Sequence, residues 1–222
     1  MEKLLSSCLI AIMLVFCCTS VFGQGQAEFK TIKLEPPTLE KGVSIMQALK
    51  QRKSVREFSD QQLAVPVLSE LLWAANGVNR DDGKRTAPAA MNIQAVDLYV
   101  MLQEGVYLYD AVKHELAPVA PGDFRKAAGM QPFVATAPLN LLYVADFDKF
   151  KTSQVPDAPE IAKLTWVAVA AGCQAQNVAL YCASEGLGNV VRASFDAQKL
   201  AEILQLRPAQ SILLAQTIGY SK

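Results

Sequence analysis

An alanine-rich stretch from Pro159 to Ser184, about 26 residues long, constrains the fold more than any other segment. Its length and composition predict one long helix. The stretch includes Ala168, Ala171, Ala175 and Ala179, whose small side chains let another helix approach closely. We therefore expect this helix either in the core or at the seam of a dimer.

Shorter helices and strands are predicted along the rest of the chain. Apolar residues at every second position have the period of a strand, and those spaced by three or four have the period of a helix. The predicted helices are 44–51, 65–76 and 197–206, with a weak helix at 124–129; the predicted strands are 96–100, 106–109, 139–144, 189–193 and 212–218. Pro118 and Pro121 are expected to break the chain. This alternation indicates one mixed α+β domain, although it does not set the strand order.

The first residues have the pattern of a signal peptide. Lys3 supplies a positive charge, residues 9–16 are an apolar run too short to span a bilayer comfortably, and Gly23 offers a cleavage site. An uncleaved N-terminal anchor is the alternative. We divide the chain into a signal peptide (1–23), a polar leader (24–43) and one domain (44–222). The mature protein is expected to be exported, periplasmic or extracellular, with no stable membrane span after cleavage.

Charge and residue counts narrow the possible partners and chemistry. Lys plus Arg and Asp plus Glu both number 21, so no net charge attracts nucleic acid or a membrane. Cys173 and Cys182 would lie about 13 Å apart on opposite faces of the long helix, too far for a disulfide, and are expected to be core thiols. His114, the only histidine, is expected to be exposed on a strand. We therefore predict no metal site and no catalytic acid, base or nucleophile.

A short basic segment follows the first helix. An extended chain would place Arg52, Ser54 and Arg56 on one face and Lys53 on the other. Guanidinium groups suit phosphates and planar heteroatom edges, where they form paired hydrogen bonds. A solvated surface patch is the alternative for so short a run. Together with the scarcity of acids and bases, the segment suits a flat anionic cofactor that performs the chemistry itself.

Four segments, spread over roughly residues 44–222, together resemble the nitroreductase-like flavoprotein family. They are Arg52-Lys53-Ser54-Val55-Arg56-Glu57-Phe58, Thr86-Ala87-Pro88-Ala89-Ala90-Met91-Asn92-Ile93-Gln94, Glu185-Gly186-Leu187-Gly188 and Ile218-Gly219-Tyr220-Ser221-Lys222. Residues 71–79 and 105–110 are most similar to the SagB-type dehydrogenase branch. The resemblance implies a three-layer fold, with a central and mostly antiparallel sheet flanked by helices. It also implies FMN bound at the interface of a homodimer.

The resemblance assigns the phosphate end of FMN to the basic segment. Arg52 would hold the phosphate, and Ser54 would bond the ribityl or pyrimidine region. Arg56 would face the N1–C2=O edge, where negative charge develops on reduction. Lys222 falls where the family often places a second cation on the phosphate.

Two other segments would contact the flavin ring. Asn92 would bond the isoalloxazine with Gln94 nearby, and the backbone N–H of Ala193 or Ser194 would face flavin N5. The chain departs from the family in having Ala95-Val96 in place of a frequent Pro-Trp. It also has Arg192 where an apolar residue is usual, and this guanidinium is expected to meet either an anionic substrate or solvent.

The resemblance implies an FMN-dependent oxidoreductase with a ping-pong mechanism. A small-molecule donor such as NAD(P)H would reduce the flavin, and an acceptor such as a nitroaromatic or a quinone would then take its place. In the SagB-type branch, the flavin would instead dehydrogenate a substrate. The alternatives are an exported protein that binds flavin or another small planar ligand without turnover, and a structural domain with no cofactor.

Overall fold

A seven-stranded sheet forms the centre of the molecule in the computed structural model, which describes residues 29–222. Its strand order is β1-β4-β3-β2-β5-β7-β6, and neighbouring strands all pair antiparallel. The strands are β1 (Ile32–Lys33), β2 (Val96–Met101), β3 (Gly105–Asp110), β4 (Glu115–Pro121), β5 (Leu139–Asp146), β6 (Leu187–Arg192) and β7 (Gln210–Tyr220). The predicted signal peptide lies outside the described residues.

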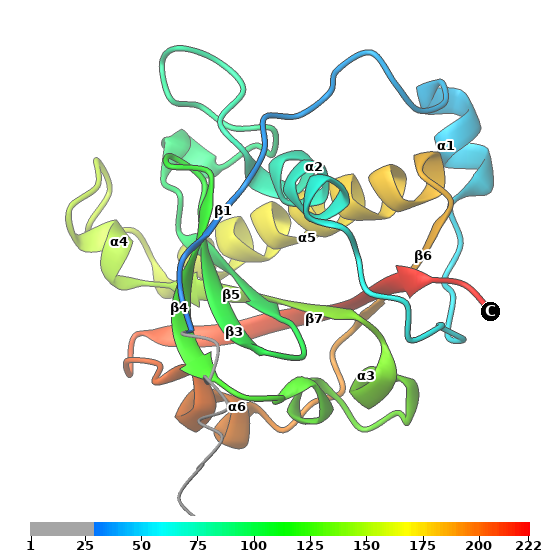
Figure 1. Ribbon diagram of the computed structural model, residues 1–222. Helices are drawn as coiled ribbons and strands as arrows, with labels where there is room; N and C mark the ends of the chain where they lie inside the picture. The colour runs from blue at the N-terminus through cyan, green and yellow to red at the C-terminus, as the bar shows by residue number, and fades with distance from the viewer. Residues whose placement is uncertain (1–28) are drawn as a thin grey trace, which may run out of the picture.

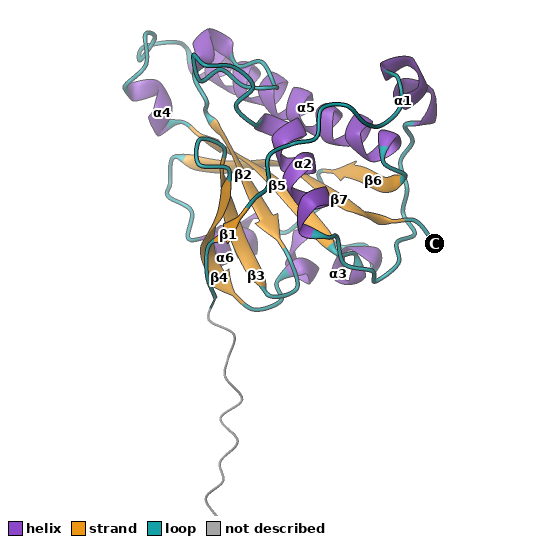
Figure 2. Cartoon of the chain, turned by 45° about the horizontal axis from the view of Figure 1, so that its top comes forward, coloured by secondary structure: helices purple, strands orange, loops and turns teal. Residues whose placement is uncertain are grey.

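Helices cover both faces of this sheet and complete three layers (Figures 1 and 2). The long helices α2 and α5 lie on one face, and α6 lies on the other with the shorter α3 and η2. The helices are α1 (Ile45–Gln51), α2 (Val65–Asn76), η1 (Ala90–Asn92), η2 (Arg125–Ala128), α3 (Phe133–Thr136), α4 (Asp148–Lys151), α5 (Glu160–Ser184) and α6 (Ala197–Leu204). The predicted α+β three-layer fold is therefore confirmed.

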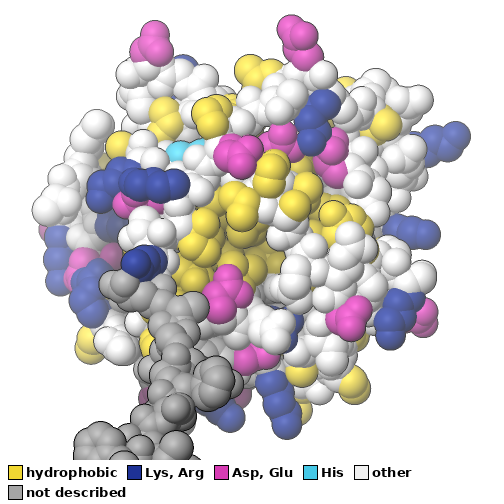
Figure 3. All heavy atoms as spheres, in the orientation of Figure 1, with side chains coloured by type: hydrophobic (Ala, Val, Ile, Leu, Met, Phe, Trp, Pro, Cys, Tyr) yellow, Lys and Arg dark blue, Asp and Glu magenta, His cyan; other side chains and the backbone are white. Residues whose placement is uncertain are grey.

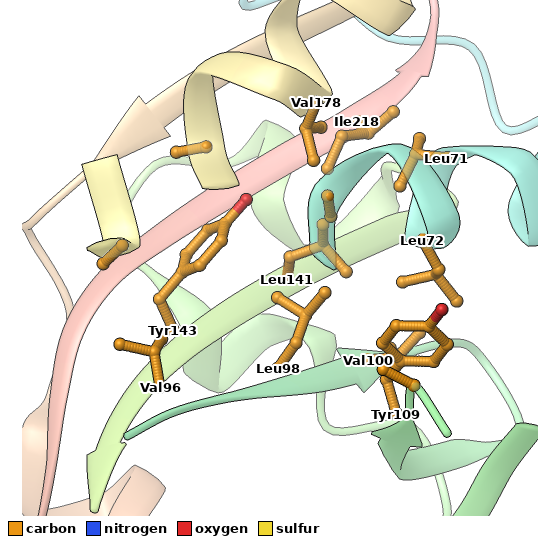
Figure 4. Packing of buried hydrophobic residues seen from close by; sticks show 14 of the residues in the cluster. Leu71, Leu72, Val96, Leu98, Val100, Tyr109, Leu141, Tyr143, Val178 and Ile218 are labelled. Atoms are coloured by element: carbon orange, nitrogen blue, oxygen red, sulfur yellow. The ribbon is translucent and has the colours of Figure 1, made fainter. Parts of the chain in front are cut away.

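The larger core lies between the sheet and the α2–α5 layer (Figure 4). Leu71 and Leu72 of α2 are fully buried and face Leu98 and Leu141 of the sheet, with Val178 of α5 beside them. Burying one such side chain stabilises the fold by roughly 1.5–3 kcal/mol. The spacing that predicted α2 from the sequence is thus the spacing of its buried face.

Helix α5 confirms the prediction made from the alanine-rich stretch. On this helix, Ala171, Ala175 and Ala179 are buried, whereas Ala168 is exposed. Its 25 residues extend for about 37 Å, and it packs on β2, β6 and β7 of the sheet. Cys173 and Cys182, the cysteines among the described residues, are free, as expected; Cys182 is buried and Cys173 only partly so.

Pro118 does not break the chain but lies within β4. The short strand β1 covers β4 only at Glu115 and Leu116, so Pro118 lies at the edge of the sheet, where a missing N–H is tolerated. Strand β1 itself falls in the predicted leader, and two residues are too few to show a period.

His114 is not an exposed strand residue, because it ends the turn before β4 with a positive φ of 49°. Its ring is partly buried between two partners: Nδ1 lies 2.9 Å from the Tyr109 hydroxyl and Nε2 lies 2.9 Å from the Glu35 carbonyl oxygen. Burial lowers the pKa of His114, although the bond to Glu35 opposes this shift. The ring is a structural group that ties the N-terminal segment to the turn.

Charged side chains do not gather on the face drawn in Figure 3. Lys and Arg are scattered around the rim, and apolar side chains occupy a hollow at the centre. Within residues 29–222, every helix is too short or too polar to cross a membrane.

Candidate functional site

The basic segment after α1 is held between β6 and the end of the chain. Helix α1 begins at a Ser44 capping box, in which Ser44 and Gln47 each bond the other's backbone. The segment then runs alongside β6, with the Val55 N–H donating to the Asn189 carbonyl at 2.8 Å. At its far end, the Lys222 N–H donates to the Glu57 carbonyl at 3.3 Å. Three of the four segments that suggested a family thus meet at one end of the sheet.

Two glycines make this meeting possible. Gly186 follows α5 with a φ of 71°, the left-handed conformation that commonly ends a helix. A Cβ on Gly188 would lie 2.8 Å from Val55 Cγ1 and 2.9 Å from Ser221 Oγ, which is too close for either contact. The Gly-x-Gly sequence therefore serves a helix end and a close packing of three segments.

The predicted alternation along the basic segment is present. Lys53 and Val55 help to line a cavity of about 480 Å³ beside Asn189, and the lining includes none of Arg52, Ser54 and Arg56. These three side chains are exposed, as is Lys222. We call Arg52, Ser54, Arg56 and Lys222 the cationic corner. Within residues 29–222, none of its three cations forms a side-chain ion pair, so their charge is available to a ligand.

Asn92 and Gln94 line a different cavity, of about 730 Å³. Met91 and Asn92 both have left-handed backbone angles, with φ of 51° and 57°, which non-glycine residues seldom adopt. The Asn92 side-chain oxygen accepts a 2.8 Å hydrogen bond from Gln94. Strained backbone of this kind is concentrated at functional sites.

This cavity and the cationic corner lie at opposite ends of the sheet. Asn92 lies shortly before the start of β2. At this end of the sheet the first residue of β2 pairs with Ala145 of β5, and Ala145 pairs with Ser211 of β7. The corner adjoins Gly219 at the other end of β7, eight residues away, or about 26 Å. Figures 1 and 2 both place the C-terminus beside α1 and away from α4. One chain therefore does not bring Asn92 and Gln94 to the corner.

Ala193 and Ser194 lie between these two ends. Both are exposed and follow the last residue of β6, Arg192, which stands opposite Ala215 near the middle of β7. The cationic corner adjoins the start of β6, and Ala193 and Ser194 follow the end of the same strand.

Arg192 meets neither an open cavity nor solvent, contrary to both expectations, because only 7% of it is exposed. Its guanidinium donates to the Ala128 carbonyl at 2.8 Å, to Asn140 Oδ1 at 3.1 Å and to Thr217 Oγ1 at 2.8 Å. Burial lowers the pKa of Arg192 to about 10. This side chain joins β5, β6, β7 and η2.

A third cavity, of about 410 Å³, holds an ionic cluster around the buried Glu70 that no local sequence pattern predicted. Glu70 of α2 pairs there with Lys41 and accepts a 2.9 Å hydrogen bond from the Tyr181 hydroxyl of α5. Burial acts to raise the pKa of Glu70, but the bonds from Lys41, Tyr181 and Thr38 lower it overall. These groups satisfy one another, and their wide spacing in the sequence hid the cluster.

Arg85 was also missed, although it directly precedes the Thr86-Ala87-Pro88 motif. It lines the same 730 Å³ cavity as Asn92 and Gln94. A basic residue in a polar loop is usually exposed to solvent, and only the folded structure shows that Arg85 lines a cavity.

Comparisons with known proteins agree with this architecture. The model of the "Nitroreductase family" matches residues 49–220. The "Putative nitroreductase MJ1384" of Methanocaldococcus jannaschii is 29% identical over 194 residues, which cover 83% of this chain and 95% of that protein. The crystal structure of a "putative nitroreductase" from Ralstonia eutropha JMP134 has 42% identity and a TM-score of 0.80, covering 87% of this chain and 90% of that one.

A more distant structure shares the fold alone. It is the NADPH:FMN oxidoreductase of Vibrio harveyi complexed with NAD+, at 21% identity and a TM-score of 0.60, covering 80% of this chain and 69% of that one. The family match spans most of the sheet and both long helices. The chain belongs to the nitroreductase family.

Proposed function

We propose that the protein is an FMN-dependent oxidoreductase whose cofactor lies between two copies of the chain. The cationic corner is the observation that carries this proposal. Arg52, Arg56 and Lys222 present unpaired charge beside the Ser54 hydroxyl, on backbone fixed by β6 and β7. A phosphate matches this set, because guanidinium and ammonium groups form strong charge-assisted hydrogen bonds with it. The fold shared with the Vibrio harveyi NADPH:FMN oxidoreductase supports the same cofactor by analogy.

The second copy would supply Asn92 and Gln94, which lie too far from the corner in one chain. In a two-fold dimer, each surface patch that one copy offers is offered by the other as well. Helix α5 exposes Ile161 (72%), Leu164 (46%) and Val169 (59%) toward its N-terminal end. Helix α1, near the other end of α5, exposes Ile45 and Met46. Antiparallel packing would cover these apolar residues and bring the Asn92 end of one copy to the corner of the other.

The cofactor, when bound, would supply the hydride chemistry, and the chain would orient it and stabilise charge. Arg56 would hold negative charge on the pyrimidine edge, and the Ala193 or Ser194 backbone N–H would bond N5. The chain places no acid or base among these groups. We expect ping-pong kinetics, because donor and acceptor would use one exposed face in turn. NADH and NADPH are the donors to test, with nitroaromatics and quinones as acceptors.

The similarity to the SagB-type branch does not identify a substrate for this protein. Residues 105–110 form β3, which lies inside the sheet, so they bear on the fold rather than on the site. The predicted signal peptide would place the mature enzyme outside the cytoplasm, where reduced nicotinamide is scarce. The electron donor would then be a compound other than NADH or NADPH.

The cofactor is tested by purifying the chain, titrating it with FMN and comparing two neighbouring variants. Arg52→Ala should weaken FMN binding about 10- to 100-fold, because it removes charge-assisted hydrogen bonds. Lys53→Ala should bind FMN as the wild type does, since its side chain lies on the other face. Equal binding by both variants would remove Arg52 from the site, and a chain that takes up no FMN would refute the proposal. A yellow protein that no donor bleaches anaerobically would indicate a binding protein instead.

A further inference from the structure

The loop backbone at Arg85 is held in place by a backbone bridge and by hydrogen bonds of the next residue, Thr86. Arg85 pairs with Val78 across a short hairpin, and the Thr86 N–H donates to the Gly77 carbonyl at 2.9 Å. The Thr86 hydroxyl also donates to the Trp73 carbonyl at 3.1 Å, which attaches the loop to α2. The backbone that carries the Arg85 side chain is therefore fixed in position.

The Arg85 guanidinium forms no hydrogen bond or ion pair with any of residues 29–222. Its Nε is buried and makes no hydrogen bond. Asp97 and Asp110 interact with Arg85 electrostatically, but each already has a cationic partner: Asp97 accepts from Lys149 at 2.5 Å, and Asp110 pairs with Lys113 at 3.7 Å. Burial lowers the pKa of Arg85. A partly buried, unpaired charge is costly, and it persists where a ligand supplies the counter-charge.

The cavity beside Arg85 suits such a ligand. Its volume of about 730 Å³ falls within the usual range for small-molecule sites. Amide and hydroxyl groups of Asn92, Gln94 and Ser153 line it, together with the apolar side chains of Met91 and Ile93. No Asp or Glu belongs to this lining, and Lys149 is already neutralised by Asp97.

We propose that this cavity is the subsite for a substrate carboxylate, which Arg85 binds through its guanidinium fork. A planar carboxylate matches that fork and balances a single unpaired charge. A phosphate dianion would need a second unpaired cation, which the lining does not offer. The inference rests on the proposed function, which brings the flavin ring to Asn92 and Gln94. The substrate class is accordingly a small planar molecule with one carboxylate.

Benzoate is the probe, and calorimetry measures its binding to the purified protein with and without FMN. Arg85→Met should weaken benzoate binding about 10- to 100-fold. Arg85→Lys, which keeps the charge but not the fork, should fall between Arg85→Met and the wild type. Lys84→Met is the matched control, because Lys84 is exposed and pairs with Asp82. It should bind benzoate normally.

Separate outcomes distinguish this inference from the proposed function. FMN titration of the same variants should show unchanged cofactor affinity, and a loss in Arg85→Met would assign Arg85 to the cofactor instead. Inorganic phosphate that binds through Arg85 more tightly than benzoate does, shown by weaker phosphate binding in Arg85→Met but not in Arg52→Ala, would overturn the choice of a carboxylate. Equal benzoate binding by wild type and Arg85→Met would overturn the subsite, whether or not FMN binds. A chain that binds benzoate through Arg85 but takes up no FMN would keep the subsite and refute the proposed cofactor.

Discussion

At the scale of single residues, the surroundings of three arginines separate structure from function. Arg125 is buried and paired with the Asp123 carboxylate at 2.7 Å. Arg192 is buried among neutral acceptors that satisfy its donors. Arg85 has neither kind of partner within the described chain. Since an unsatisfied buried group costs about 1–3 kcal/mol, Arg85 is the one whose position the fold alone does not explain.

His114 makes the stability of the fold depend on pH in a defined window. Its pKa is lowered by burial, so as the pH falls below about 6.5 the unfolded chain takes up the proton first. Stability should therefore fall from about pH 6.5 downward, by at most about 1.4 kcal/mol per pH unit, until the folded protein is protonated too. His114→Asn tolerates the positive φ and does not titrate. Urea unfolding at pH 5.5 and 7.5 should show a smaller loss in this variant. The same loss in both proteins would contradict the assignment, since the chain has no other histidine.

At the scale of elements, local periodicity predicted the large helices and strands because burial imposes it. Helix α5 and strand β5 are long enough for their patterns to be unambiguous. Strand β1 has two residues and no period, and Pro118 is tolerated only because β4 lies at an edge there. The burial of Arg192 depends on Ala128, Asn140 and Thr217, which are distant in sequence. No local pattern could predict such a contact.

Arg192 should stabilise the sheet by joining three strands to η2. Arg192→Met would leave the Ala128 carbonyl and Asn140 Oδ1 without this donor inside the protein. We expect it to lower the free energy of unfolding by about 1–3 kcal/mol, measured by urea denaturation. Arg80→Met, at an exposed position, should change it by less than about 0.5 kcal/mol. Equal stability of the two variants would show that the network is dispensable.

At the scale of the whole molecule, the sequence identified candidate residues but not how they are divided between two ends of the sheet. The basic segment meets Asn189 and Lys222 through long-range backbone pairs, which spacing along the chain does not reveal. Asn92 and Gln94 fall at the far end of β7, and only strand order could show this. The resemblance implied a dimer interface, and the separation gives a physical reason for it.

The proposed dimer should be required for binding of the proposed FMN cofactor. Leu164→Glu places a charge on the exposed apolar face of α5 and should give a monomer, measured by sedimentation, that no longer retains FMN. Val112→Glu adds the same charge at an exposed turn position and should leave both properties unchanged. A monomeric Leu164→Glu protein with full FMN affinity would place the whole site within one chain.

Mixing two defective chains tests the shared site directly. Arg52→Ala and Asn92→Ala should each bind FMN poorly on their own. In a mixed dimer, one site combines both defects and the other combines the intact Arg52 of one chain with the intact Asn92 of its partner. Unfolding and refolding the variants together should therefore restore one FMN site per mixed dimer, measured by flavin absorbance after gel filtration. If both groups served a cofactor within the same chain, every site would keep one defect and mixing would restore nothing.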